Sequence, residues 1–270
     1  MRLRSIFALS PAGSNLDEAL GSVSDGLLAT VAHASVPVEE ARHAALAAVT
    51  AAVAAGKFAF VTVNHPRTQF LRGDLEALVS PELRGVVINH CVEPQDVRDT
   101  AVLLREFELA REIEPGTIAI IPAIGTARGL VRCIEIVDAA PRVAALLFDS
   151  PAYTRDIGAR IEERGTRFSY ARGAIVAAAR AFDCLPLVTA DAFELRDLGH
   201  YGFSGAVVSD ARAAVSAATA FATLELERRR AQSLIDAYDA TKAERAWVAR
   251  VDDEVADASA VRRARQLLDH

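Results

Sequence analysis

Lysine is almost absent from this chain of 270 residues, which contains only Lys57 and Lys242. Lys57 comes directly before an apolar run that reads as a strand, and Lys242 lies in a charged segment near the C-terminus. A Schiff-base aldolase needs a desolvated lysine inside its pocket. In an α/β barrel, the residue before a strand lies at the end opposite the active site. The sequence therefore argues against Schiff-base chemistry.

Clustered cysteines are missing as well. The three cysteines, Cys91, Cys133 and Cys184, lie far apart and form no CxxC or CxxH pattern. Such isolated cysteines are typical of reduced thiols in a cytosolic protein and indicate neither a disulfide framework nor a zinc site. We therefore expect a cytoplasmic protein.

The chain also lacks long apolar runs and a surplus of basic residues. No run approaches the roughly 18 apolar residues of a membrane span, and the apolar run after Arg4 is too short for a signal peptide. The net charge is −6, whereas a nucleic-acid-binding surface needs clustered lysine and arginine. We therefore expect no membrane partner and no nucleic-acid partner.

The chain does contain a regular alternation of apolar runs and helix-like segments. The helix-like segments include Val38–Ala55, Pro94–Arg111 and Phe168–Ala181. Strands that alternate with helices form a parallel sheet, and eight such units in about 220 residues favour a closed barrel. The eight runs are Ser5–Leu9, Gly26–Val31, Phe58–Val63, Gly85–Ile88, Ile118–Ile121, Val143–Phe148, Leu185–Val188 and Ala206–Val208.

The predicted fold class is therefore α/β, with a (β/α)8 TIM barrel over residues 1–222 and a C-terminal helical extension over residues 223–270. The extension begins with a long, heavily charged helix and ends with a second helix, Ala258–Leu268. A helix outside a finished barrel packs on the barrel or on a neighbouring subunit. We expect the neighbouring subunit, and hence an oligomer.

Several motifs, in their order and spacing, resemble the HpcH/HpaI aldolase and citrate lyase β-subunit family, especially its citrate lyase β-like branch. The resemblance runs through most of the chain, from Arg4-Ser5 at the first strand to the tail DEVADASAVRRARQLL (Asp253–Leu268), which looks like the closing segment of the family. The motifs are VNHP (Val63–Pro66), GVVINHCVEPQDV (Gly85–Val97), IGTARG (Ile124–Gly129), FDSPAYTRDIG (Phe148–Gly158), FSYARGAIVAAARAF (Phe168–Phe182) and GFSG (Gly202–Gly205).

The resemblance implies a lyase that makes or breaks C–C bonds in 2-oxo acids or acyl-CoA thioesters, assembled as a homotrimer or hexamer. In that family a Mg²⁺ ion, held by one Glu and one Asp, polarises the substrate carbonyl and stabilises an enolate. Mg²⁺ is a hard cation that needs such oxygen ligands, and it supplies several kcal/mol of charge stabilisation.

This chain departs from the family pattern at its chemical positions. Gly125 stands at the position of the metal-binding Glu, and Ala152 at that of the metal-binding Asp. Thr62 stands at the substrate-binding Arg, and His90 at a Lys. Losing several kcal/mol of enolate stabilisation costs about a thousandfold or more in rate. We therefore predict no metal site and no cofactor, although the family implies Mg²⁺.

Three histidines, His33, His65 and His90, follow consecutive predicted strands. They could form a replacement site that binds zinc or acts as acid and base, since histidine suits both roles near neutral pH. Alternatively, each histidine hydrogen-bonds to loop backbone, and His65 belongs to a structural NHP turn. Asp149 directly follows the sixth predicted strand and could supply one new acidic group.

Arg128 lies in the first turn after the fifth predicted strand. Together with the backbone N–H groups of Gly125, Thr126 and Ala127 it could hold a carboxylate or phosphate. It could also be a framework arginine that ties this loop to its neighbour. With His65, these residues are the candidate ligand contacts.

Three functional hypotheses follow. The first is a pseudoenzyme for the family reaction that binds a small carboxylate or an acyl-CoA-like ligand, or serves as an accessory subunit. The second is an active lyase or thioesterase on a rebuilt site, with His33, His90 and Asp149 as catalytic candidates. The third is a structural partner of an active paralogous subunit, acting through its tail helices.

Overall fold

The computed structural model describes residues 3–10, 13–31, 36–159, 168–191, 194–222, 225–243, 248–251 and 254–268. Its contacts divide the chain into two compact units. The first unit is Arg4–Phe221, and the second is built mainly from the residues after Phe221. None of the helices among the described residues is both long and apolar enough to cross a membrane.

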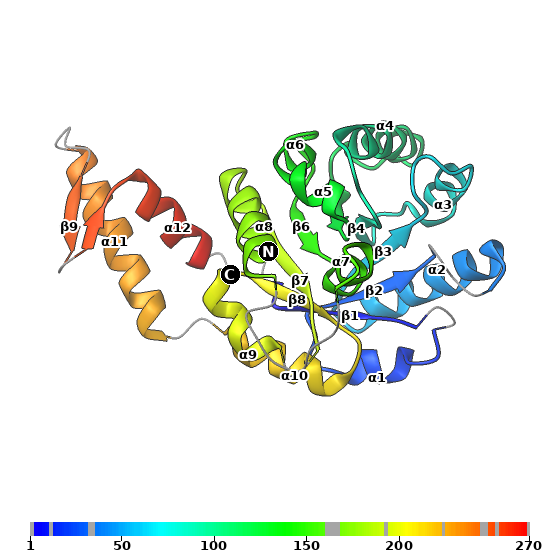
Figure 1. Cartoon of the computed structure of the whole chain (residues 1–270), viewed down its shortest axis with the longest axis horizontal. Helices are drawn as coiled ribbons and strands as arrows, with labels where there is room; N and C mark the ends of the chain where they lie inside the picture. Colours follow the sequence, from blue (N-terminus) through cyan, green and yellow to red (C-terminus); the bar gives the residue numbers. More distant parts are fainter. Residues whose placement is uncertain are drawn as a thin grey trace. The chain divides into compact units, whose positions relative to one another are not determined.

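Eight parallel strands form a closed barrel in the first unit (Figure 1). Each strand pairs with the next, and β8 pairs with β1 to close the ring. All eight predicted strands are present, so the predicted TIM barrel is confirmed. The strands are β1 (Ser5–Ala8), β2 (Gly26–Thr30), β3 (Phe58–Val63), β4 (Leu83–Ile88), β5 (Ala119–Ile124), β6 (Ala145–Phe148), β7 (Leu185–Thr189) and β8 (Gly205–Val208).

Helices surround the barrel and cover its outer face (Figure 1). In α2 the buried residues include Ala41, Ala45, Ala48 and Ala52, whose spacing places them on one helical face toward the strands. The helices of this unit are α1 (Leu16–Gly21), α2 (Val38–Ala54), α3 (Leu71–Leu78), α4 (Pro94–Ala110), α5 (Ala127–Val131), α6 (Cys133–Val137), α7 (Ser150–Asp156), α8 (Ser169–Ala181), α9 (Leu195–Leu198), the 3₁₀ turn η1 (Gly199–Tyr201) and α10 (Ala211–Ala220).

The barrel interior pairs large side chains with glycines. Phe60 in β3 is 1% exposed and lies between the neighbouring strands β2 and β4. A Cβ atom on Gly26 would approach the Phe60 ring to 3.1 Å, and one on Gly85 would approach it to 3.3 Å. The two glycines therefore provide the space that the aromatic ring fills.

A buried ion pair fastens the barrel at the start of β5. The Glu108 carboxylate accepts hydrogen bonds from the backbone N–H groups of Gly116 and Ile118, both at 2.9 Å, and pairs with Arg142 at 2.7 Å. Glu108 is completely buried. Because it lies near the C-terminal end of α4, it joins this helix to β5 and to the segment before β6.

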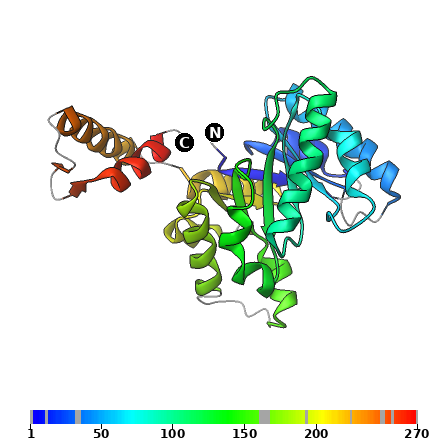
Figure 2. The ribbon, with the colours of Figure 1, turned by 90° about the horizontal axis from the view of Figure 1, so that it is seen from above.

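The second unit has its own small core. It contains α11 (Glu225–Ala243), the antiparallel pair β9 (Ala249–Val251) and β10 (Glu254–Ala256), and α12 (Ala258–Leu268). The two helices lie side by side (Figure 2). The predicted final helix has the bounds of α12, but the strand pair was not predicted. The core residues are Ala231, Leu234, Tyr238, Ala256, Val261 and Ala264.

Candidate functional site

Gly125 and Ala152 meet at the C-terminal edge of the barrel, where β5 and β6 end. Gly125 directly follows β5, and Ala152 lies in the first turn of α7. A Cβ atom built on Gly125 would lie only 2.7 Å from the Ala152 Cβ atom and 3.5 Å from that of Asp149. The two positions at which the resemblance places the metal carboxylates are therefore neighbours, and Ala152 occupies the space that a side chain at position 125 would need.

Asp149 begins α7 as its N-cap. Its Oδ1 atom accepts a hydrogen bond from the backbone N–H of Ala152 at 3.0 Å. Such a bond satisfies one of the free donors at a helix start. The acidic group that the sequence singled out is half-buried, and this bond commits one of its oxygens to helix capping.

His65 is held by hydrogen bonds at both ring nitrogens. Its Nε2 atom lies 3.3 Å from Oδ2 of Asp96, and its Nδ1 atom accepts from the backbone N–H of Arg67 at 3.3 Å. The side chain joins the loop after β3 to the start of α4. With both nitrogens engaged, His65 has none left for a ligand in this arrangement.

Asp96 is the buried carboxylate between the loop after β3 and the start of α4. Besides His65, it accepts hydrogen bonds from the backbone N–H groups of Val92 at 3.0 Å and Glu93 at 3.1 Å. Burial opposes its ionisation, but the hydrogen bonds from His65 and Val92 and the charges of His65 and Arg67 outweigh burial. The pKa of Asp96 is therefore held below its ordinary value.

The remaining histidine candidates are not assembled around a common centre in the described residues. His33 lies outside them. His90 is exposed, follows β4 and adopts a left-handed backbone with φ of 52°. In the part of the chain that the structure describes, no group of three or more His, Cys, Asp or Glu side chains is placed to hold a metal ion. The described donor set therefore does not fit the Mg²⁺ of the family.

Thr126 and Gly129 shape the loop after β5. The Thr126 Oγ1 atom accepts from the backbone N–H of Gly129 at 3.0 Å and so caps α5. A Cβ atom on Gly129 would lie 2.5 Å from the backbone oxygen of Cys91. This glycine lets α5 approach the loop after β4. The backbone N–H of Ala127, a predicted anion donor, bonds to Asp156 at 2.7 Å.

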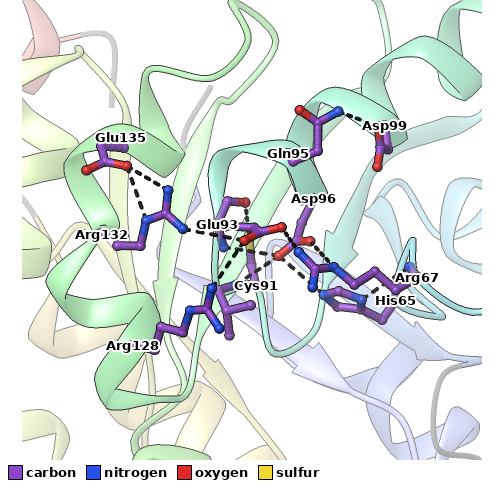
Figure 3. Close-up of polar contacts among 11 residues, drawn as sticks. His65, Arg67, Cys91, Glu93, Gln95, Asp96, Asp99, Arg128, Arg132 and Glu135 are labelled. Carbon is purple, nitrogen blue, oxygen red and sulfur yellow. Dashed lines mark hydrogen bonds and ion pairs between the residues drawn. The ribbon is translucent and has the colours of Figure 1, made fainter.

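Arg128 belongs to a group of ion pairs that the sequence did not reveal (Figure 3). Its guanidinium lies 3.4 Å from Oε2 of Glu93, and that of Arg132 reaches the same oxygen at 3.4 Å. Arg67 pairs with the other oxygen, Oε1. We call Arg67, Arg128, Arg132 and Glu93 the Glu93 cluster. It joins the loops that follow β3, β4 and β5.

Thr62 and Lys57, which the sequence singled out, both make hydrogen bonds that hold the barrel together. Thr62 is buried, and its hydroxyl accepts a hydrogen bond from the backbone N–H of Val31 at 3.2 Å. Lys57 precedes β3, and its Nζ atom donates to the backbone oxygens of Ser22 at 2.8 Å and Ser24 at 2.7 Å. Burial lowers the pKa of Lys57, and Asp25 opposes this shift. The lysine is thus engaged at the barrel end opposite the candidate site.

Comparison with known proteins shows which family the sequence matches. The family model for HpcH/HpaI aldolase/citrate lyase matches residues 6–217. A citrate lyase subunit beta-like protein of Deinococcus radiodurans is 29% identical over 223 residues, covering 78% of this chain and 74% of the relative. The citrate lyase subunit beta of Escherichia coli K12 is 26% identical over 217 residues, covering 77% of this chain and 72% of the relative.

A solved structure has the same fold. CitE from Mycobacterium tuberculosis, in complex with magnesium, acetoacetate and coenzyme A, superposes with a TM-score of 0.66 and 17% identity. The match covers 98% of this chain and 96% of the other. At this identity the likeness establishes the barrel fold alone.

Proposed function

We propose that this chain, which belongs to the HpcH/HpaI aldolase/citrate lyase family, binds a small carboxylate or acyl-CoA-like ligand without Mg²⁺-dependent C–C bond cleavage. It would serve as a non-catalytic or accessory member of the family. The crystallised relative from Mycobacterium tuberculosis holds acetoacetate and coenzyme A on the same fold. The open strand ends of the barrel are the corresponding place for a ligand here.

The contact between Gly125 and Ala152 carries this proposal. The distance of 2.7 Å between a built Cβ and the Ala152 Cβ leaves no room for a carboxylate side chain at position 125 unless the backbone moves. Neither residue offers an oxygen ligand from its side chain. Without the ion, the charge on an enolate loses several kcal/mol of stabilisation, which is about a thousandfold or more in rate.

The test compares the purified chain with a family member that carries both metal carboxylates. Calorimetry with Mg²⁺ and Mn²⁺ at millimolar concentration should show no binding to this chain. Malyl-CoA- or oxaloacetate-like substrates should not turn over, while coenzyme A thioesters or small 2-oxo acids should still bind. Metal-dependent turnover by the wild-type chain would overturn the proposal.

A rebuilt His/Asp site has less support from the geometry. His65 and Asp96 do form a pair, but Asp96 caps α4 and both nitrogens of His65 are engaged. For this alternative, stoichiometric zinc in the purified protein, lost on His90→Ala, would be the decisive observation.

The C-terminal unit supports a role in assembly. It forms a core of its own, which suits a segment that contacts a neighbouring subunit of a homotrimer or hexamer, or a paralogous subunit. Light scattering of the full chain and of a chain ending at Phe221 measures this. A smaller assembly for the shortened chain supports the role, and an unchanged mass contradicts it.

A further inference from the structure

The two ring nitrogens of His65 face different partners (Figure 3). Nε2 lies 3.3 Å from Oδ2 of Asp96, and Nδ1 lies 3.3 Å from the backbone nitrogen of Arg67. A backbone N–H can only donate, so Nδ1 accepts this bond and carries no hydrogen. The hydrogen of the neutral ring is therefore on Nε2, which donates it to Asp96. The partners thus select one neutral form of the ring.

The turn at residues 65–68, which follows β3, depends in part on this acceptor. The backbone oxygen of His65 accepts from the backbone N–H of Thr68 at 2.8 Å and from its hydroxyl at 2.7 Å. Pro66 has no N–H to donate. Among the described hydrogen bonds within this turn, the bond from Arg67 is therefore the one whose acceptor is a group that can take up a proton.

Charged and titratable groups surround the ring. Asp96, at the start of α4, is 1% exposed and lies on the Nε2 side. The guanidinium of Arg67 lies 3.5 Å from the other Asp96 oxygen, Oδ1, and also pairs with Glu93. Cys91, in the loop after β4, is buried, and burial together with the charge of Asp96 raises the pKa of its thiol. Cys91 is thus uncharged near neutral pH, and the described partner on the Nδ1 side is the N–H of Arg67.

We propose that His65 is a proton-operated switch that releases this turn at mildly acid pH. Histidine is the side chain that ordinarily takes up a proton between about pH 8 and pH 5. Since Nε2 already carries a hydrogen, the added one goes to Nδ1 and there faces the N–H of Arg67. Two donors cannot bond to each other, so the amide of Arg67 turns away. The bond from Nε2 to Asp96 remains as an ion pair and keeps the ring in place.

The switch acts at the barrel edge where β3 ends. The side chain of Arg67 connects the turn with Glu93 in the loop after β4. The proton on His65 therefore sets how firmly these two loops are held together. This inference concerns the free chain and goes beyond the proposed function, because no ligand takes part in the switch.

The test is amide hydrogen exchange of the full chain, followed by NMR at pH 8 and at pH 5. The protection factor of the Arg67 amide compares its exchange rate with that of an unfolded peptide at the same pH. It should fall about tenfold at pH 5, as expected for the loss of one hydrogen bond. The nitrogen shifts of the His65 ring, measured on the same sample, should show an unprotonated Nδ1 at pH 8 and two N–H groups at pH 5.

Two substitutions hold the switch in its two states. His65→Asn places an amide oxygen near the position of Nδ1 and does not titrate, so the Arg67 amide should stay protected at both pH values. His65→Gln places its amide nitrogen near the position of Nε2 and leaves Arg67 without an acceptor. The protection of the Arg67 amide should then be low at both pH values.

The matched control is His43→Gln. His43 is exposed on α2, and its Nδ1 atom bonds to the backbone oxygen of Glu39 at 2.8 Å within the same helix. Its substitution should leave the pH response of the Arg67 amide unchanged. Equal protection of this amide at pH 8 and pH 5 in the wild-type chain overturns the inference. A pH response that persists in His65→Asn, or disappears in His43→Gln, overturns it as well.

Circular dichroism and thermal unfolding at both pH values show that each variant is folded. If His65→Gln does not fold, the comparison of the wild-type chain with His65→Asn decides the matter, because these two differ in whether the acceptor for Arg67 can take up a proton.

Discussion

Position 125 accepts no side chain without movement of its surroundings. A Cβ atom there would lie 2.7 Å from the Ala152 Cβ atom. We expect Gly125→Ala to lower the free energy of unfolding by about 1–3 kcal/mol, the usual cost of overpacking. Urea denaturation measures the change.

Two further variants control this prediction. Gly173 lies inside α8 with no atom within 4 Å of a built Cβ, so Gly173→Ala should raise stability by about 0.5–1 kcal/mol. The double variant Gly125→Ala/Ala152→Gly should recover part of the loss. If it is no more stable than Gly125→Ala, the contact is not the cause.

Asp96 makes part of the stability depend on pH. The pKa of Asp96 is lower in the folded chain than the ordinary carboxyl value of 3.8. Its contribution to the free energy of unfolding is therefore fully present above pH 3.8, and it is lost as the pH falls through the lowered pKa of the folded chain. We expect Asp96→Asn to cost about 3 kcal/mol at pH 7. The difference in the free energy of unfolding between wild type and variant should become smaller at acid pH. Urea denaturation at a series of pH values from 7 to 3 measures it.

Asp99→Asn is the control for this experiment. Asp99 is exposed and accepts a hydrogen bond from Gln95, apart from the His65–Asp96 pair. Its replacement should change stability by about 0.5 kcal/mol or less. An Asp96→Asn gap that stays constant down to pH 3 would contradict the assigned role of this carboxylate.

Part of the candidate site could be predicted at the level of residues. The absence of carboxylates at Gly125 and Ala152 is readable from the motifs. The partners of Arg128 are not, because Glu93 is 35 positions away and meets it only through the registers of β4 and β5. Arg67 follows the VNHP motif directly and Glu93 precedes a helix-starting proline. In a barrel, these two sequence positions predict that Arg67 and Glu93 lie at the C-terminal ends of neighbouring strands.

At the scale of elements, Glu108 joins α4 to β5. Replacing it with glutamine leaves Arg142 buried without a charge partner, since the two pair at 2.7 Å. We expect Glu108→Gln to destabilise the fold by about 3 kcal/mol. Guanidinium denaturation measures this value.

Glu106→Gln serves as the comparison two residues earlier on α4. Glu106 is half exposed and pairs with Arg72 on the surface, where such pairs contribute about 0–1 kcal/mol. Equal losses in the two variants would show that burial of the Glu108 pair has no special effect.

The strands and helices of the barrel were largely predictable because each has a strong local pattern. The end of β5 was not. The sequence predicts a strand that stops at Ile121, before Pro122. In the structure β5 continues to Ile124, with Pro122 pairing with Ile88 and Ala123 with Leu147. Proline lacks the N–H donor, but the neighbouring pairs sustain the ladder.

The strand pair β9–β10 was missed for a different reason. Its two strands have three residues each, too few for periodicity to show. Only β10 falls within Asp253–Leu268, the stretch that resembles the closing segment of the family. The alternation around Val251 and Val255, on either side of two aspartates, is the available hairpin signal.

For the whole molecule, two separate hydrophobic cores predict that a destabilising substitution in one core leaves the hydrogen exchange of the other unit unchanged. Leu234 is 6% exposed in the core of the C-terminal unit. We expect Leu234→Ala to cost that unit about 2–5 kcal/mol and to speed hydrogen exchange in α11 and α12. The amides of the eight barrel strands should keep their protection.

Leu75→Ala is the reciprocal variant, because Leu75 is fully buried in α3. It should speed exchange in the barrel and leave α11 and α12 unchanged. Faster exchange across both units in either variant would show that the two cores unfold together.

The contact at Gly125 also constrains how this protein can change in the course of evolution. A carboxylate side chain introduced at position 125 would place its Cβ atom 2.7 Å from the Ala152 Cβ atom, and a longer side chain at position 152 would bring further atoms to the same pair of positions. We therefore expect a carboxylate at position 125 alone to destabilise the fold before a second carboxylate is present to share an ion. By the same argument, new ligand contacts at the exposed strand ends can arise by single substitutions more readily than a pair of metal-binding carboxylates at positions 125 and 152.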